Sequence, residues 1–126
     1  MIRVPARRGI GTRCEVRIPD PSCNPYLAFA AMMAAGLDGI ERDIDCGEPV
    51  NRNIWEMSQR EKKRLKIHEL PASLDEALDF LEKDKLLREA LGDHIFDHFI
   101  FNKRTEWSDY IKEIHEWELD RYLDRY

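Results

Sequence analysis

The sequence predicts a mostly α-helical chain with one or two short β-strands near the N-terminus, followed by about four to five helices. Two observations support this fold class. Residues 12–18 alternate polar and apolar side chains, which is typical of a strand. Later segments begin with helix-capping residues and repeat their apolar residues at helical spacing. The length of 126 residues allows one domain.

The charges are unevenly distributed along the chain. Residues 1–17 contain five arginines and one acid, which gives +4. Because the whole chain carries −5, residues 18–126 carry −9. The acidic balance argues against nucleic acid as a partner. The longest apolar run has ten residues (26–35), which argues against a membrane span, since a span needs roughly 20.

The three cysteines, Cys14, Cys23 and Cys46, form no CxxC or CxxH pair. A structural zinc site is therefore not expected. An odd number of widely spaced cysteines fits a reduced, cytoplasmic protein better than a secreted one.

The alternating segment at residues 12–18 is the predicted strand. Its period of two places Arg13, Glu15 and Arg17 on one face. Prolines at positions 19 and 21 end the strand, because proline lacks the backbone N–H that a sheet requires.

The first predicted helix begins with Asn24 as its N-cap and Pro25 as its first residue. It is expected to end near Leu37, because Gly36 and Gly39 lie on either side of that residue. Its residues are apolar on every side. A helix without a polar face is expected to be buried all round.

An acidic loop is expected over residues 41–57. After it, Ser58 and Glu61 have capping-box spacing, which predicts a short helix ending near Leu65. Ser73 and Glu76 have the same spacing. The apolar stripe of the helix that follows consists of Leu74, Ala77, Leu78 and Leu81.

The C-terminal third of the chain is predicted to be helical. A short helix runs from Asp84 to Leu91 and is stopped by Gly92. From Asp93 onward the helical pattern continues without a break. Its apolar residues are Phe96, Phe99, Ile100, Trp107, Tyr110, Ile111, Ile114, Trp117, Tyr122 and Leu123.

The face formed by Arg13, Glu15 and Arg17 is a candidate chemical site. Guanidiniums bind carboxylates and phosphates through paired N–H groups. A carboxylate between them can hold a divalent cation, and phosphoryl transfer depends on that combination of charges. The alternative is a solvated face on which Glu15 only pairs with the arginines.

Two other segments carry weaker signals. His94 and His98 stand four residues apart on one helix face, as two metal ligands could, but no third ligand accompanies them. Exposed helix histidines are the simpler interpretation. The apolar stripe from Trp107 to Trp117 is expected to pack in a core or between subunits rather than to bind another partner.

Several segments resemble the C-terminal third of type I glutamine synthetase, and the match covers essentially the whole chain. The most specific stretch, EVR followed by PDPSCNPYLAFAA, runs from residue 15 to residue 31. The segments are Arg3-Val4-Pro5, residues 11–17 (GTRCEVR), residues 19–29 (PDPSCNPYLAF), residues 35–40 (AGLDGI), Asn53-Ile54, residues 70–74 (LPASL) and Glu76-Ala77-Leu78.

The resemblance implies an ATP-dependent glutamate–ammonia ligase that uses Mg²⁺ or Mn²⁺. Arg3 and Arg13 resemble residues that contact ATP, and Glu15 resembles a metal ligand. Arg17 resembles the arginine that grips the substrate glutamate. No residue of this chain is implied to be catalytic in the narrow sense. The implied partners are glutamate, ATP and ammonia, together with further copies of the protein, since family members are typically dodecamers.

The resemblance also implies that parts of the enzyme are missing. Residues 1–126 match only the C-terminal segment of the catalytic domain. The rest of that domain and the N-terminal β-grasp domain have no counterpart here. The chain alone is therefore expected to be inactive. Trp55 stands where the adenylylated subgroup has Tyr, which implies the non-adenylylated subgroup.

Two alternatives remain open. The first is a γ-glutamyl ligase of the same superfamily that acts on another amine. The second is a helical assembly module without chemistry of its own.

Overall fold

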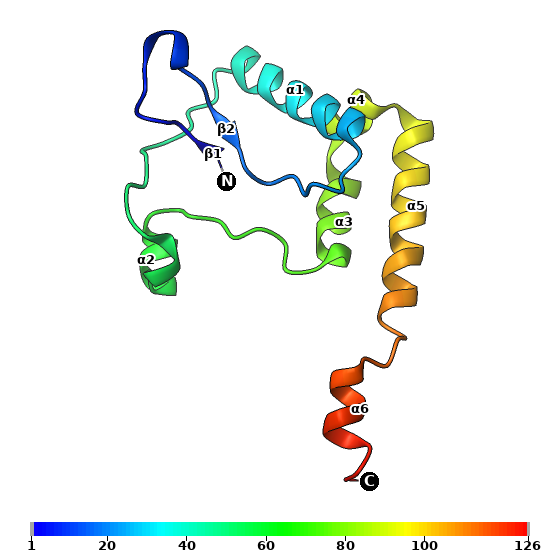
Figure 1. Cartoon of the computed structure of the whole chain (residues 1–126). Helices are drawn as coiled ribbons and strands as arrows, with labels where there is room; N and C mark the ends of the chain where they lie inside the picture. The colour runs from blue at the N-terminus through cyan, green and yellow to red at the C-terminus, as the bar shows by residue number, and fades with distance from the viewer. Residues whose placement is uncertain (1, 126) are drawn as a thin grey trace.

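The computed structural model describes residues 2–125 and has the predicted mostly α-helical class, as Figure 1 shows. Two short strands precede the helices, and two single-turn 3₁₀ helices lie in loops. The strands are β1 (Ile2–Arg3) and β2 (Glu15–Val16), and the 3₁₀ turns are Gly9–Gly11 and Ile54–Glu56. The helices in this part of the chain are α1 (Pro25–Glu41), α2 (Gln59–Arg64), α3 (Leu74–Lys83), α4 (Lys85–Leu91), α5 (Asp93–Tyr110) and α6 (Glu116–Tyr122).

The predicted capping residues begin the helices. The Asn24 side chain accepts hydrogen bonds from the backbone N–H groups of Tyr26 and Leu27, at 3.0 and 3.3 Å. Ser58 and Glu61 form a complete capping box at the start of α2. The Ser73 hydroxyl accepts from the Glu76 N–H at 3.1 Å and begins α3. These contacts confirm three predicted helix starts, because each satisfies backbone donors that the helix leaves unpaired.

Two predicted helix ends are wrong. Helix α1 continues past Leu37 to Glu41, with both glycines inside it. Its last turn carries an ion pair between Arg42 and Asp38 at 3.1 Å, four residues apart, which supports the extension.

The second error concerns the C-terminal pattern, which is not one continuous helix. Helix α5 ends at Tyr110, where Lys112 and Glu113 donate to carbonyls only three residues back. This tightened turn is followed by extended backbone at His115, and α6 then begins.

The helices α3, α4 and α5 pack on one another, and α1 packs across α4 (Figure 1). The buried centre of this unit consists of Leu78 from α3 and Phe96 from α5, which are 2% and 0% exposed. The guanidinium of Arg88 lies 4.2 Å from the centroid of the Phe96 ring. The predicted stripe of α3 therefore faces the other helices, as expected.

The chain exposes more surface than a compact protein of its size. A compact monomer of 14.9 kDa would expose about 7000 Å². This chain exposes 11479 Å². The strands and α2 lie to one side of the helical unit, and α6 projects from its far end (Figure 1). None of the helices in residues 2–125 is long and apolar enough to cross a membrane.

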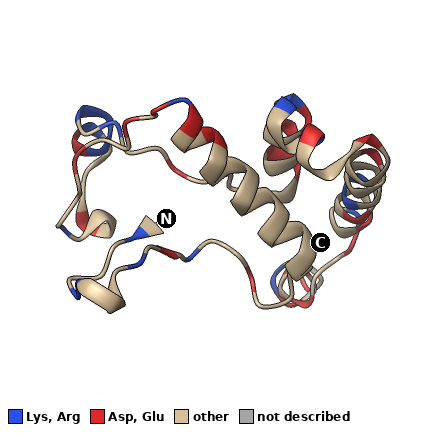
Figure 2. Ribbon diagram, turned by 90° about the horizontal axis from the view of Figure 1, so that it is seen from above, with Lys and Arg blue, Asp and Glu red and all other residues tan. Residues whose placement is uncertain are grey.

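The expectation that α1 is buried all round is wrong for this chain. Its surface is almost free of charged residues except near its C-terminal end, as Figure 2 shows. Nevertheless Tyr26, Phe29 and Met33 are 83%, 61% and 63% exposed. The reason is geometric: α1 contacts α4 along one side, and a single small helix cannot cover the remaining faces.

Candidate functional site

The candidate site is built on the two-stranded hairpin at the N-terminal end of the chain. Strands β1 and β2 pair antiparallel, with Arg3 opposite Glu15 and Ile2 opposite Val16. The strand predicted over residues 12–18 is thus only two residues long, because its partner strand is equally short. Directly opposite residues on antiparallel strands point to the same face, so Arg3 joins the face of Glu15.

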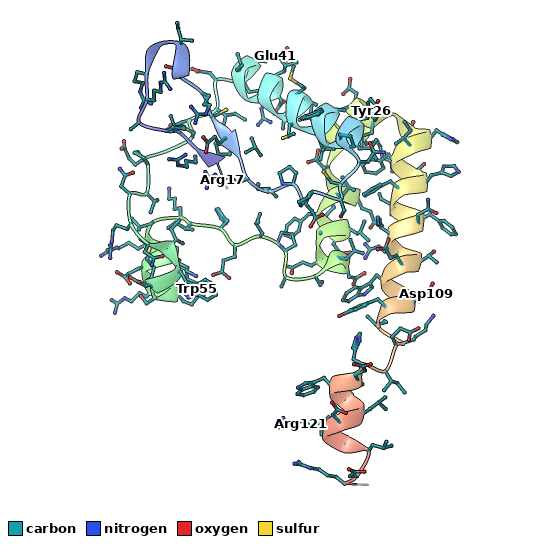
Figure 3. All side chains as sticks on the ribbon, in the orientation of Figure 1. Arg17, Tyr26, Glu41, Trp55, Asp109 and Arg121 are labelled. Carbon is teal, nitrogen blue, oxygen red and sulfur yellow. The ribbon has the colours of Figure 1, made fainter. Side chains whose placement is uncertain are left out.

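Four side chains meet on this face, and we refer to Arg3, Arg13, Glu15 and Arg17 as the Glu15 cluster. Arg3 Nη1 and Arg17 Nη2 each donate to Glu15 Oε2 at 2.8 Å. Arg13 donates to Glu15 Oε1 from Nε at 3.1 Å and from Nη2 at 2.8 Å. The sequence-based prediction that Arg13, Glu15 and Arg17 share a face is confirmed by these contacts. Figure 3 labels Arg17 on the hairpin, apart from the helical unit.

The cluster carries one negative and three positive charges. The hydrogen bonds from Arg3, then Arg17 and Arg13, lower the pKa of the Glu15 carboxyl to about 2. Glu15 is consequently ionised throughout the neutral range. Its side chain is 21% exposed, whereas the three arginine side chains are 52–54% exposed. The outer surface of the cluster is therefore cationic and open to solvent.

This arrangement suits an anion better than a cation. An ionised carboxylate offers about four lone-pair sites, and four guanidinium N–H groups occupy them here. Within residues 2–125 there is no group of three or more His, Cys, Asp or Glu side chains that could hold a metal. The described residues therefore do not form a divalent-cation site by themselves.

The other two arginines of residues 1–17, Arg7 and Arg8, contact the loop between the strands. Arg8 Nη1 donates to the carbonyl of Pro5, the buried residue of this loop. The side chain of Arg7 lies against Gly11, so closely that a Cβ there would be 2.7 Å from Arg7 Cδ. Both contacts shape the loop that joins β1 to β2. They place these two arginines outside the Glu15 cluster.

The histidine pair is exposed on α5. The rings of His94 and His98 lie 4.3 Å apart, and His98 Nδ1 is 2.8 Å from the His94 carbonyl oxygen. That ring nitrogen therefore bonds to the backbone, and this pair belongs to no larger group of potential ligands in the described residues.

The tryptophan stripe is divided by the break between α5 and α6. Trp107 is half-buried and packs on Tyr110, with ring centroids 5.7 Å apart. Ile114 and Trp117 are 67% and 62% exposed. Trp117 packs edge-on against Tyr122 of its own helix, with ring centroids 6.1 Å apart, so each part of the stripe makes local aromatic contacts.

Sequence reasoning missed a second charged cluster, between α3 and α5. The guanidinium of Arg104 pairs with three carboxylates of α3, including Asp79 at 2.6 Å and Glu82 at 3.1 Å. Asp75, Asp79 and Glu82 recur at helical spacing, which was the available signal. The cluster keeps a net charge of −2, and its ion pairs join α3 to α5.

Comparison with known proteins gives a consistent result. The family model described as "Glutamine synthetase, catalytic domain" matches residues 1–122. The glutamine synthetase of Thermus thermophilus is 59% identical over 126 residues, which are 100% of this chain and 28% of that protein. The glutamine synthetase of Methanosarcina mazei is 53% identical over 123 residues, or 98% of this chain and 28% of that protein.

Solved structures also match. A structure titled "GmaS/ADP complex-Conformation 1" superposes with a TM-score of 0.78 and 39% identity, over 90% of this chain and 25% of that chain. A second, titled "Apo GmaS without ligand", gives a TM-score of 0.74 at 39% identity, over 88% of this chain and 25% of that chain. The chain therefore spans little more than a quarter of the length of the relatives that it matches.

Proposed function

The chain belongs to the glutamine synthetase family, and we propose that its 126 residues are the C-terminal segment of a catalytic domain that makes glutamine from glutamate, ammonia and ATP. In this reaction ATP phosphorylates the side-chain carboxylate of glutamate. Ammonia then displaces phosphate from the γ-glutamyl phosphate. The observation that carries the proposal is the convergence of three guanidiniums at one carboxylate, on a family-matched segment.

The three arginines of the Glu15 cluster supply positive charge for the phosphate and carboxylate groups that take part in phosphoryl transfer. Arg3 and Arg13 are assigned to the phosphate groups of ATP, where their N–H groups stabilise the charge that spreads over the phosphoryl oxygens. Arg17 is assigned to the carboxylate of the substrate glutamate, which a guanidinium binds through two parallel hydrogen bonds. Their half-exposed side chains can reach a ligand on the open side of the hairpin.

Glu15 is assigned as one ligand of a Mg²⁺ or Mn²⁺ ion whose other ligands lie outside these residues, and to bind it the carboxylate would have to release guanidinium N–H groups that occupy its oxygens here. Such an ion neutralises phosphate oxygens. Since the described residues do not complete its coordination, the 126-residue chain alone is expected to make no glutamine. Trp55 is 91% exposed in the loop before α2 and has no hydroxyl, so tyrosyl adenylylation at this position is not expected.

A chimera tests the proposal. The segment of the Thermus thermophilus enzyme that aligns with this chain would be replaced by residues 1–126, and ATP-dependent glutamine formation would be measured. We expect activity of the same order as that of the parent enzyme, because the proposal assigns the same roles to the same segment. A chimera that assembles like the parent but forms no glutamine would refute the assignment. The control is the parent enzyme with the segment deleted.

A second candidate is a γ-glutamyl ligase for an amine other than ammonia. The residues that would select the amine are expected outside this chain, so the chimera reports on the nucleotide and glutamate contacts only. Amine specificity has to be measured on an enzyme that contains a complete catalytic domain.

The proposed assembly and location follow from the exposed surfaces. The uncovered faces of α1 are largely apolar, and Trp117, Leu119 and Tyr122 are exposed on α6, which fits a subunit of a homo-oligomer such as the dodecamers of the family. Cys14, Cys23 and Cys46 are free and exposed, which fits the reducing cytoplasm.

A further inference from the structure

The carboxylate of Glu15 occupies the same donors that an incoming anion would need. Arg13 presents its Nε and Nη2 groups as a fork to Oε1. A fork of this kind is the geometry by which arginine binds an external carboxylate or phosphate. Arg3 and Arg17 direct one N–H each to Oε2 at 2.8 Å. A phosphate or carboxylate that used these groups would have to displace Glu15 from them.

No other acid competes in this part of the chain. Glu15 is the single acidic residue among residues 1–17, and the nearest acid that follows, Asp20, bonds to Ser22. The cluster therefore keeps a net charge of +2 after its internal pairing, on side chains that are about half exposed. An anion that carries more negative charge than one carboxylate can outcompete Glu15 electrostatically.

We propose that Glu15 is an internal competitor in the ligand-free protein: its carboxylate occupies the guanidiniums of Arg3, Arg13 and Arg17, and a polyphosphate anion displaces it without needing a divalent cation. The inference rests on the proposed assignment of these arginines to phosphate and carboxylate groups. It adds that Glu15 weakens anion binding by the cluster when no cation is present. Neutralising Glu15 then strengthens the binding of an anion.

The test uses the purified 126-residue chain and inorganic tripolyphosphate, with a chelator to remove divalent metals and at low ionic strength. Isothermal titration calorimetry would compare the original chain with its Glu15→Gln variant. We expect the variant to bind tripolyphosphate about tenfold more tightly, since a charged competitor has been removed from the guanidiniums. Glu113→Gln is the matched control, because it removes the same charge from an exposed site without an ion pair among the described residues and should leave the affinity unchanged. Adding Arg13→Gln to Glu15→Gln should cancel the gain.

A second measurement does not depend on the folding of a variant. In the original chain, the NMR signal of the Glu15 carboxyl carbon should shift as tripolyphosphate saturates, because the carboxylate leaves its guanidinium partners. The inference is overturned if Glu15→Gln binds as weakly as the original chain or more weakly, if neither chain binds tripolyphosphate, or if binding leaves the Glu15 signal unmoved. An active chimera combined with any of these results would leave the proposed function standing, whereas an inactive chimera would refute that function separately.

Discussion

Truncating Phe96 should destabilise the helical unit more than any other single apolar truncation on α5. The ring is 0% exposed and lies at the contact between α5 and α4, beneath the guanidinium of Arg88. Removing a buried phenylalanine ring to alanine typically costs about 3–5 kcal/mol, through lost burial and the cavity that remains. With about 4 °C of Tm for each kcal/mol in a chain of this size, Phe96→Ala should lower Tm by at least about 10 °C.

The control is Phe101→Ala on the same helix. Phe101 is 70% exposed, so its truncation should change stability by no more than about 0.5 kcal/mol. Both variants remove the same atoms and give the helix the same new residue, so they differ in burial alone. Thermal unfolding followed by far-UV circular dichroism measures both. If Phe96→Ala melts within 2 °C, roughly, of Phe101→Ala, the packing of α5 described above is wrong.

Three further predictions concern charge and exposed surface. The Glu15 carboxyl should titrate near pH 2 by NMR, because its arginine partners lower its pKa in the folded chain. The pairing therefore stabilises the hairpin fully above the unfolded pKa of about 4.3, and this stabilisation is lost as the pH falls through 2. A titration midpoint near pH 4, roughly the unfolded value, would exclude the pairing. Arg104→Met should lower Tm by several degrees, because it leaves the α3 carboxylates without their cation. Arg60→Met should not lower Tm, because Arg60 is exposed on α2 and has no ion-pair partner within residues 2–125. The purified chain should self-associate at high concentration and bind a hydrophobic dye, because its α1 face is uncovered; monomeric scattering without dye binding would contradict this.

Local signals predicted the helix starts well. Asn24, Ser58 and Ser73 each satisfy backbone donors within three residues, so their effect does not depend on the rest of the fold. The stripe of α3 was equally predictable, because its period follows from the helix itself. The ends of α1 and α5 were harder, since neither glycine inside α1 stopped it and no residue between Tyr110 and Glu116 is a helix breaker.

Long-range features were predicted only in part. The shared face of Arg13, Glu15 and Arg17 follows from the period of a strand. The place of Arg3 depends on a cross-strand register that spacing alone does not give, and only the family resemblance pointed to it. The prediction that α1 is buried on all sides was wrong for a different reason. The apolar composition of α1 indicates a helix that is stable when other elements cover all its faces, and the described residues supply too few packing partners to cover them.

The central claim is that the Glu15 cluster forms the ATP- and glutamate-binding edge of a glutamine synthetase site. The most direct test is the kinetics of the Thermus thermophilus chimera with Arg17→Ala, and with Arg60→Ala as the matched control. The account predicts that Arg17→Ala raises KM for glutamate by about tenfold or more while KM for ATP changes little, because a charged bidentate contact to the substrate carboxylate is lost. An Arg17→Ala chimera with the same KM for glutamate as Arg60→Ala would contradict it.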